Sequence, residues 1–383
     1  MEAGESTATK AKDSTDKILL AKVVEVKFKS PIKVANNNAT VQPPHWSLDE
    51  NVNDGPCSKK PAAYMIRGGK GASQDVEVKV EVLESKNVSG NGRLFGVLGG
   101  TLIQGDCPLS AGSHTVAARI VELPEGITWL RGDMVWGLEV EALGTSVGLG
   151  SSRIEVFFIL GTPAPYYQNS KGVWAEALRF LCTRAGVVGV SDATEAVARV
   201  TRYCHTSHGL HYEAVGGRPA YGCGGQGGRF QLDLYMACVY GLANCYDQAG
   251  AVQSLSGALG AIADWIYLNP FGFINITALL GWGACNSPFF MDDSDETGGV
   301  VNLVVNPQIV PPNDPRRTAF GNHAFCAFSG KVYDACAGPH VGTESYDEYC
   351  QASIDYTTRL YHPRFQPGTA LDMQWCSGVT AVV

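Results

Sequence analysis

Apolar and polar side chains alternate in short runs over residues 21–162, and turn residues separate the runs. Alternation with a period of two is typical of a β-strand that buries one face. The run VEVKVEV at Val76–Val82 shows this pattern without a break. The other runs are Val23–Phe28, Thr115–Val121, Val135–Val140 and Ile154–Leu160. Many short strands with glycine-rich turns between them predict an antiparallel β-sandwich over residues 21–162.

Two observations refine this first domain. A sandwich of this kind has the architecture of immunoglobulin-like domains. The chain lacks the Cys…Trp…Cys spacing of a true immunoglobulin domain, so the expectation concerns architecture alone. Residues 1–20 begin with a polar stretch of mixed charge, and we expect a flexible tail there.

The pattern changes after residues 163–165, whose sequence PAP marks a linker. The many glycines of residues 209–228 predict an exposed loop or a loose hairpin. The predicted helices are Trp174–Leu181, Asp192–Arg202 and Asp247 to about Leu259, and the predicted late strands are Val300–Val305, His323–Phe328 and Lys331–Cys336. Helices followed by strands predict an α+β domain over residues 166–383.

Cys245 precedes the long predicted helix in the sequence NCYDQA. A cysteine at a helix N-terminus lies at the positive end of the helix dipole, near backbone N–H groups without helical acceptors. This setting favours the thiolate, which is the nucleophilic form of cysteine. The backbone N–H groups of Cys245 and Tyr246 are then placed to bind a developing oxyanion.

A histidine and an aspartate fall on one face of a predicted hairpin. Ser329-Gly330 separates two apolar runs and is a signal for a two-residue turn. That turn pairs Phe325 with Asp334, and His323 lies two residues before Phe325. Because side chains alternate between the faces of a strand, His323 and Asp334 share a face. A carboxylate beside an imidazole in this way can orient it for proton transfer.

These residues resemble the active site of the transglutaminase-like superfamily, which is related to papain-like cysteine enzymes. The similarity rests on the motif C-x-D-x-A at a helix start, a strand that begins with histidine, and an aspartate after a short hairpin. It covers about residues 203–339. It implies a papain-like α+β fold, with Cys245 as nucleophile, His323 as general acid–base and Asp334 as the third member of a triad. Many members of the superfamily carry a β-domain upstream.

The chain departs from the superfamily pattern at several points. The aromatic residue that often follows the histidine as H-x-W is Phe325 here, and the spacing from histidine to aspartate is short. The upstream oxyanion donor of the superfamily, often Trp, Gln or Tyr, has no clear counterpart. The candidates for oxyanion donor or cleft wall are Tyr246, Gln226, Tyr212, Tyr221 and Trp282.

Two other clusters carry ligand-type side chains. Residues 204–211 place a cysteine and three histidines close together, and zinc accepts both residue types. Gly209 interrupts the helix that would align them, so solvated or cleft-lining histidines are favoured over a zinc site at His205, His208 and His211. The acidic run Asp292–Glu296 lacks the glycine and the distal glutamate of an EF-hand, and a solvated loop is favoured there.

Composition narrows the class of protein. The chain has 383 residues, enough for two domains, and 45% hydrophobic residues, enough for full cores. The net charge of −8 provides no basic face for nucleic acid or anionic lipid. We expect no targeting segment, no membrane span and no cofactor, because neither an apolar segment of sufficient length nor a dinucleotide-binding glycine motif is evident.

The main hypothesis is therefore an enzyme that transfers an acyl group from a protein or peptide amide through a thioester on Cys245. Water as acceptor gives hydrolysis or deamidation, and an amine gives cross-linking. The lack of an evident calcium site favours a peptidase or amidase over an animal-type calcium-dependent transglutaminase. One alternative is a catalytically inert recognition protein that binds its partner through the β-sandwich. Another is a zinc hydrolase that uses the three histidines.

Overall fold

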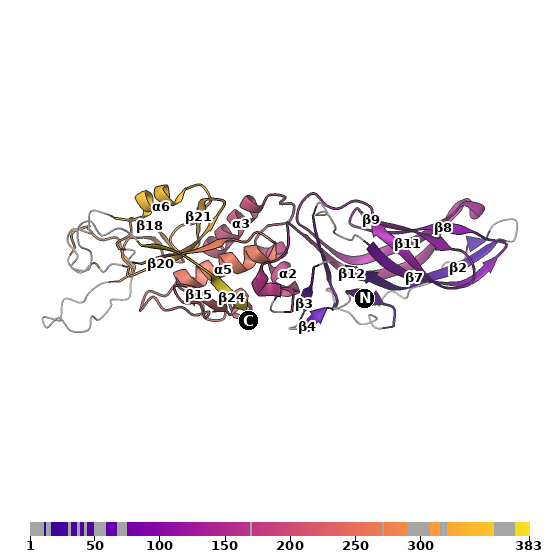
Figure 1. Cartoon of the computed structure of the whole chain (residues 1–383), viewed down its shortest axis with the longest axis horizontal. Helices are drawn as coiled ribbons and strands as arrows, with labels where there is room; N and C mark the ends of the chain where they lie inside the picture. The colour runs from indigo at the N-terminus through magenta and orange to yellow at the C-terminus, as the bar shows by residue number, and fades with distance from the viewer. Residues whose placement is uncertain are drawn as a thin grey trace. The chain divides into compact units, whose positions relative to one another are not determined.

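The computed structural model describes residues 11–12, 17–29, 32–36, 39–41, 44–49, 59–66, 75–168, 171–269, 272–289, 307–314, 317, 320–355 and 372–383. The described chain is a mixed α+β protein with more strand than helix (Figure 1). It divides into two compact units, Met1–Thr162 with Lys171–Cys182, and Pro163–Ser170 with Thr183–Val383. The predicted strand Val300–Val305 and the acidic run Asp292–Glu296 lie outside the described residues.

The first unit is built on one large sheet. Its strands follow the order β1-β2-β7-β10-β9-β8-β11-β12-β6, with β5 paired to β2. Their bounds are β1 Ala11–Lys12, β2 Ile18–Phe28, β5 His45–Ser47, β6 Ala62–Met65, β7 Asp75–Lys86, β8 Asn91–Leu98, β9 Thr101–Pro108, β10 Gly112–Ile120, β11 Thr128–Val140 and β12 Thr145–Ile159. Neighbouring strands are antiparallel, apart from β6 and β12, which are parallel.

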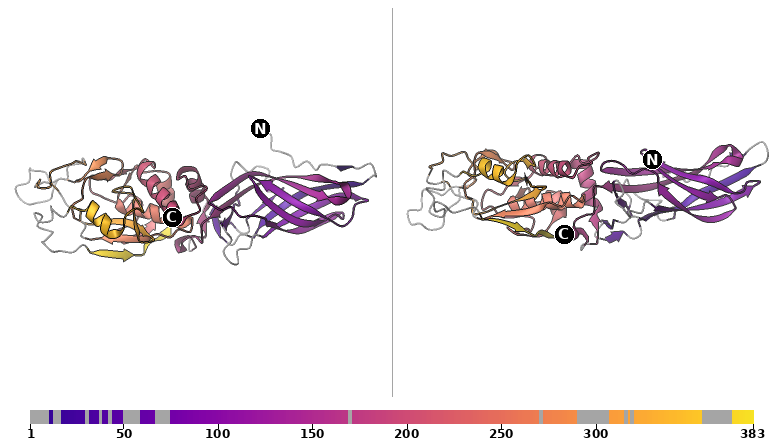
Figure 2. Two further views of the ribbon diagram at one scale, coloured as in Figure 1. Left: turned by 90° about the horizontal axis from the view of Figure 1, so that it is seen from above. Right: turned by 45° about the horizontal axis from the view of Figure 1, so that its top comes forward.

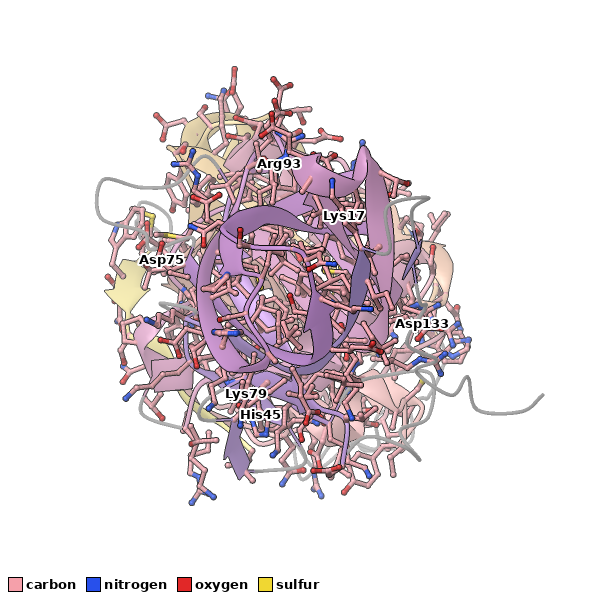
Figure 3. The ribbon with its side chains drawn as sticks, turned by 90° about the vertical axis from the view of Figure 1, so that its right-hand side faces the viewer. Lys17, His45, Asp75, Lys79, Arg93 and Asp133 are labelled. Atoms are coloured by element: carbon pink, nitrogen blue, oxygen red, sulfur yellow. The ribbon has the colours of Figure 1, made fainter. Side chains whose placement is uncertain are left out.

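This sheet curls around its own buried face. Strands β2 and β12 lie near opposite ends of the order yet pack against each other, and Figure 3 shows the curl end-on. Alternate residues of β7, from Val76 to Val82, are buried against the shared core. The predicted sandwich of two packed sheets is thus not confirmed, because these strands belong to one sheet. Alternation reports which face is buried, but two packed sheets and one curled sheet bury the same face, so the pattern could not separate them.

The predicted tail over residues 1–20 is wrong at its end. Strand β2 begins at Ile18, and the side chain of Leu19 is fully buried. The short strand β1 pairs with the first residues of β2, with Ala11 opposite Leu19. The apolar triplet at residues 18–20 can bury side chains in the core, which outweighs the polar composition of the preceding residues.

A segment after the predicted linker returns to the first unit. Strand β13 Val173–Trp174 joins β3 Val34–Asn36, which pairs with β4 Ala39–Val41. Helix α2 Ala175–Arg184 confirms the predicted helix, and its residues up to Cys182 belong to this unit. Within it, Arg179 donates to the buried carboxylate of Glu155 at 2.9 and 2.6 Å.

The second unit packs helices on a small antiparallel sheet (Figure 2). The sheet has the order β22-β21-β20-β17-β23, and helix α5 lies on β20 with α3 beside it. The bounds are α1 Pro165–Gln168, α3 Ala193–Thr206, α4 Leu232–Met236, α5 Cys245–Ala258, α6 Tyr346–Ser353, β17 Asp264–Leu268, β20 His323–Phe328, β21 Lys331–Asp334, β22 His340–Val341 and β23 Met373–Cys376. In the part of the chain that the structure describes, no helix has the length and apolar character to cross a membrane.

Three short strand pairs and one helical turn complete the described elements. They are β14 His211–Tyr212 with β16 Leu242–Ala243, β15 Gly227–Phe230 with β24 Gly378–Val382, β18 Thr277–Leu279 with β19 Gly283–Cys285, and the 3₁₀ turn η1 Glu141–Leu143. The pair β14 and β16 lies next to the start of α5, because β16 ends two residues before Cys245.

The predicted hairpin is confirmed. Ser329 and Gly330 both have positive φ angles, of 51° and 74°, as a two-residue turn of type I′ requires. The turn pairs Phe328 with Lys331, so strands β20 and β21 lie side by side in the predicted register.

Candidate functional site

Cys245 is the first residue of α5, and a complete cap holds it there. The side chain of Asn244 accepts hydrogen bonds from the backbone N–H groups of Tyr246, at 2.9 Å, and Asp247, at 3.1 Å. In return, the carboxylate of Asp247 accepts the N–H of Asn244 at 3.1 Å. This reciprocal arrangement is a capping box, and it fixes the backbone on both sides of Cys245. The thiol side chain is nearly buried, with 4% of the residue exposed.

Asp247 also anchors the glycine-rich loop to the helix start. Its carboxylate accepts the N–H groups of Ala220 at 2.8 Å and Tyr221 at 2.9 Å. Burial raises the pKa of Asp247 to about 6, although these hydrogen bonds act in the opposite direction. Asn244 adds a second tie, because its amide donates to the carbonyl of Gly217 at 2.9 Å. The aspartate of the C-x-D-x-A motif is thus a structural residue of this site.

His323 and Asp334 meet on one face of the hairpin, as the sequence predicts. The imidazole Nε2 of His323 donates to the carboxylate Oδ2 of Asp334 at 2.8 Å. Both residues are buried, at 2% and 1% exposure. His323 is the first residue of β20 and Asp334 the last of β21, so the two-residue turn determines their pairing.

The side chain of Cys245 interacts with the same imidazole and helps to raise the pKa of His323. Burial by itself lowers the pKa of His323. The charge of Asp334 and the hydrogen bonds with Asp334 and Cys245 outweigh burial and raise the pKa to about 10. The imidazole therefore carries its proton at neutral pH, next to the sulfur. A buried imidazolium between a thiol group and a carboxylate can stabilise a thiolate and later deliver a proton.

Four donors hold the carboxylate of Asp334. Oδ2 accepts from His323 and from the hydroxyl of Tyr349 at 3.0 Å, while Oδ1 accepts the N–H groups of Cys336 at 2.7 Å and Ala337 at 3.2 Å. Burial raises the pKa of Asp334, but the charge of His323 and these hydrogen bonds outweigh it and hold the pKa well below its usual range. Asp334 is thus a carboxylate throughout the neutral range.

One of the two backbone donors expected at the oxyanion site, the N–H of Tyr246, is already hydrogen-bonded. The N–H of Tyr246 donates to the side chain of Asn244 as part of the cap, so it is engaged. The prediction overlooked this competition, since an Asn before a helix is itself a strong N-cap. Among the described residues, nothing accepts a hydrogen bond from the N–H of Cys245. The N–H groups of the first helical turn have no acceptor within the helix, so this donor can bind another group.

The structure separates the other oxyanion candidates. Burial raises the pKa of Tyr212 well above its ordinary value, and the charge of Cys245 raises it further. The indole N–H of Trp282 is engaged with the carbonyl of Tyr212 at 2.9 Å. Gln226 donates to Gln374 at 3.4 Å, in the loop beside β23.

Tyr221 lies in the core and does not line a cleft as an oxyanion donor would. Its ring packs on Phe230 and Tyr235, and the residue is fully buried. Of the candidates, Tyr212 and Tyr246 are the two whose pKa the charge of Cys245 raises.

Several residues of the site escaped the sequence argument. The hydroxyl of Tyr246 donates to the side chain of Asn322, the residue before His323, and the ring of Tyr246 lies beside that of Tyr267 of β17. Adjacency to His323 could have pointed to Asn322. Tyr267 and Tyr349 reach the site from distant strands and helices, and no local pattern marks them.

The three histidines considered for zinc face different neighbours. His205 bonds to the carbonyl of Ala335 at 3.0 Å, and His208 bonds to the carbonyl of Tyr235 at 2.7 Å. His211 packs against the edge of Trp282. Within the described ranges, no group of three or more His, Cys, Asp or Glu side chains is arranged to hold a metal ion.

The comparisons with known proteins add no relative. No protein-family model and no curated protein matches this chain. The similarity to the transglutaminase-like superfamily therefore stays a prediction from the order and setting of Cys245, His323 and Asp334. The chemistry has to be argued from the geometry of these side chains.

Proposed function

We propose that the second unit is a cysteine-dependent acyl-transfer enzyme that acts on peptide or glutamine amides through a thioester. The observation that carries the proposal is the buried hydrogen bond between His323 and Asp334, together with the interaction of the Cys245 side chain with the same imidazole. These three groups are buried together, and the raised pKa of His323 keeps a proton beside the sulfur at neutral pH. Strongly perturbed pKa values cluster at functional sites, and a base beside a thiol can activate it as a nucleophile.

The proposed reaction has two stages. The sulfur of Cys245 attacks the carbonyl carbon of the amide, and the carbonyl π electrons move onto oxygen. The C–N bond then breaks as His323 gives its proton to the leaving amine, which leaves a thioester. A water molecule or an amine next attacks the thioester carbon while His323 takes a proton from it, and the sulfur departs with its electron pair. Asp334 holds the imidazole in place and balances its charge.

The developing oxyanion would be bound by the N–H of Cys245, which has no other acceptor among the described residues. The hydroxyl of Tyr212 is the proposed second donor, because burial keeps it neutral and the charge of Cys245 raises its pKa further. Two donors at the oxygen would replace the role first assigned to the N–H of Tyr246.

We further propose that the second unit has a transglutaminase-like, papain-related fold. A helix that begins with the cysteine and packs on the antiparallel strands bearing histidine and aspartate supports this assignment. The preceding β-rich unit is consistent with the domain that many members carry upstream. We favour hydrolysis of the thioester over transfer to an amine, in line with the lack of an evident calcium site in the sequence.

An activated ester tests the chemistry without knowledge of the substrate. Incubation with p-nitrophenyl acetate at pH 7 should release a burst of p-nitrophenol and add one acetyl group, located at Cys245 by peptide mass spectrometry. Cys245→Ala should abolish the burst. Cys376→Ala removes a thiol of β23 that has no part in the Cys245, His323 and Asp334 arrangement, so it should leave the burst unchanged. Acetylation spread over several thiols, or absent from Cys245, contradicts the proposal and favours the inert recognition protein.

A further inference from the structure

Tyr349 contacts the carboxylate of Asp334 at the oxygen that the backbone N–H groups do not occupy. Its hydroxyl donates to Oδ2 of Asp334 at 3.0 Å, and this same oxygen accepts Nε2–H of His323 at 2.8 Å. The backbone N–H groups of Cys336 and Ala337 occupy the other carboxylate oxygen. The carboxylate thus has donors on every side, and its rotation is blocked.

The ring of Tyr349 is itself fixed. It is fully buried and packs on Phe325, with ring centroids 4.8 Å apart, and edge-on against His340, also at 4.8 Å. His340 in turn is hydrogen-bonded to Glu344. A capping box between Ser345 and Glu348 sets the start of α6, one turn before Tyr349.

Burial also keeps the tyrosine a donor. Burial raises the pKa of Tyr349 well above its ordinary value, and the charge of Asp334 raises it further. The hydroxyl therefore retains its proton at every pH at which the site would work, and the carboxylate is the acceptor it faces. A neutral donor can orient the carboxylate without cancelling the charge that stabilises the imidazolium.

We propose that Tyr349 is a positioning residue of this site, which holds Asp334 in the plane that keeps His323 directed at Cys245. The assignment rests on the proposed function. Tyr349 acts through Asp334 and touches no reacting atom, so its loss affects the rate of acylation and leaves ester binding unchanged.

Tyr349→Phe tests this inference, since the variant loses only the hydroxyl and keeps the ring contacts. We expect the acylation rate of Cys245 by p-nitrophenyl acetate to fall about tenfold with KM unchanged, because a hydrogen bond to a charged group is lost. Tyr333→Phe is the matched control. Tyr333 is equally buried on β21, beside Asp334, and its hydroxyl has no hydrogen-bond partner among the described residues, so its rate should match the wild type.

A second comparison separates positioning from general damage. In an Asp334→Asn background, Tyr349→Phe should slow acylation no further, because its effect runs through the carboxylate. An equal slowing in both backgrounds, or a wild-type rate for Tyr349→Phe alone, overturns the assignment. If wild-type Cys245 is not acetylated at all, the proposed function itself fails, which is a distinct result.

Wild-type protein supplies a measurement that needs no variant. The proton on Nε2 of His323 and the hydroxyl proton of Tyr349 both point at one oxygen, so they lie close together. Proton NMR should give a downfield imidazole signal with a nuclear Overhauser contact to the tyrosine hydroxyl. A downfield signal without this contact overturns the shared-oxygen arrangement.

Discussion

His323 is buried between an acidic partner and a nucleophilic one. Removal from water opposes its charge, yet the balance still favours the imidazolium, because Asp334 is itself fixed as a carboxylate by four donors. The cost of desolvating the pair is met only when both groups stay charged together. The state of the site at neutral pH therefore depends on the pair as a unit rather than on either residue alone.

This pair predicts how stability depends on pH. The pKa of His323 rises from 6.5 to about 10 on folding, so its contribution to the free energy of unfolding is complete below about pH 6.5. That contribution is lost as the pH rises toward 10. Urea unfolding at pH 6.5, 8 and 9.5 should give a steeper decline for the wild type than for His323→Gln. Equal slopes, or a wild type that gains stability over this range, would show that the imidazole is neutral in the folded protein.

For single residues, the sequence predicts the side-chain pairs that follow from alternation along a strand. It does not predict the contacts that depend on tertiary packing. His323 and Asp334 are related by one turn of two residues, so alternation places them correctly. Tyr349 reaches the same carboxylate through the packing of α6 on β21, which leaves no periodic signal. The engaged N–H of Tyr246 was within reach of sequence reasoning, since Asn244 is a preferred N-cap residue.

Helix α5 is buried on all sides, and it places the cysteine against the strand that bears the histidine. Small residues permit this close packing. Gly257 faces Tyr166, whose hydroxyl donates to the carbonyl of Gln253 at 2.6 Å. A Cβ atom at Gly257 would stand 2.0 Å from that hydroxyl oxygen.

Gly257→Ala should therefore destabilise the second unit. Alanine favours a helix over glycine by about 1 kcal/mol, but overpacking costs about 1–3 kcal/mol. We expect a net loss of about 1–2 kcal/mol in the free energy of unfolding, because the clash exceeds the gain in propensity. Adding Tyr166→Phe should restore part of the loss. A single variant as stable as the wild type in urea would show that the helix and Tyr166 do not pack as described.

The elements were predicted better than their assembly. Strands such as β7 and the helices α3 and α5 follow from local periodicity and capping, including Asp192, whose side chain accepts the N–H of Glu195. The closure of the first sheet depends on contacts between β2 and β12, at opposite ends of that unit. Such long-range packing is not encoded in any single window of sequence.

The whole chain consists of two units with separate cores, and the proposed chemistry lies entirely in the second. In the first, Glu155 is fully buried at its side chain and accepts from Arg179 and from the indole N–H of Trp129, at 2.9 Å. This cluster ties the segment Lys171–Cys182 to β12.

Glu155→Gln should thus affect one unit only. Loss of one partner from a buried ion pair costs about 3–5 kcal/mol, and water at the partly exposed Arg179 reduces this to about 2–4 kcal/mol. The first unit should unfold at a lower urea concentration. The near-ultraviolet circular dichroism of its tryptophans measures this unfolding. The acylation rate of Cys245 should stay unchanged. A matching loss of reactivity would show that the site depends on the first unit.

Alkylation of the thiols with iodoacetamide tests the central claim most directly. We predict that Cys245 is labelled well before the other thiols between pH 6 and 8. Burial raises the pKa of Cys107 to about 11 and that of Cys182 to about 12, so these two thiols remain protonated. His323→Ala should slow the labelling of Cys245 about 100-fold or more, because the imidazolium that stabilises the thiolate is gone. Uniform labelling of the thiols, or a rate at Cys245 that His323→Ala does not reduce, would contradict a cysteine–histidine pair in this protein.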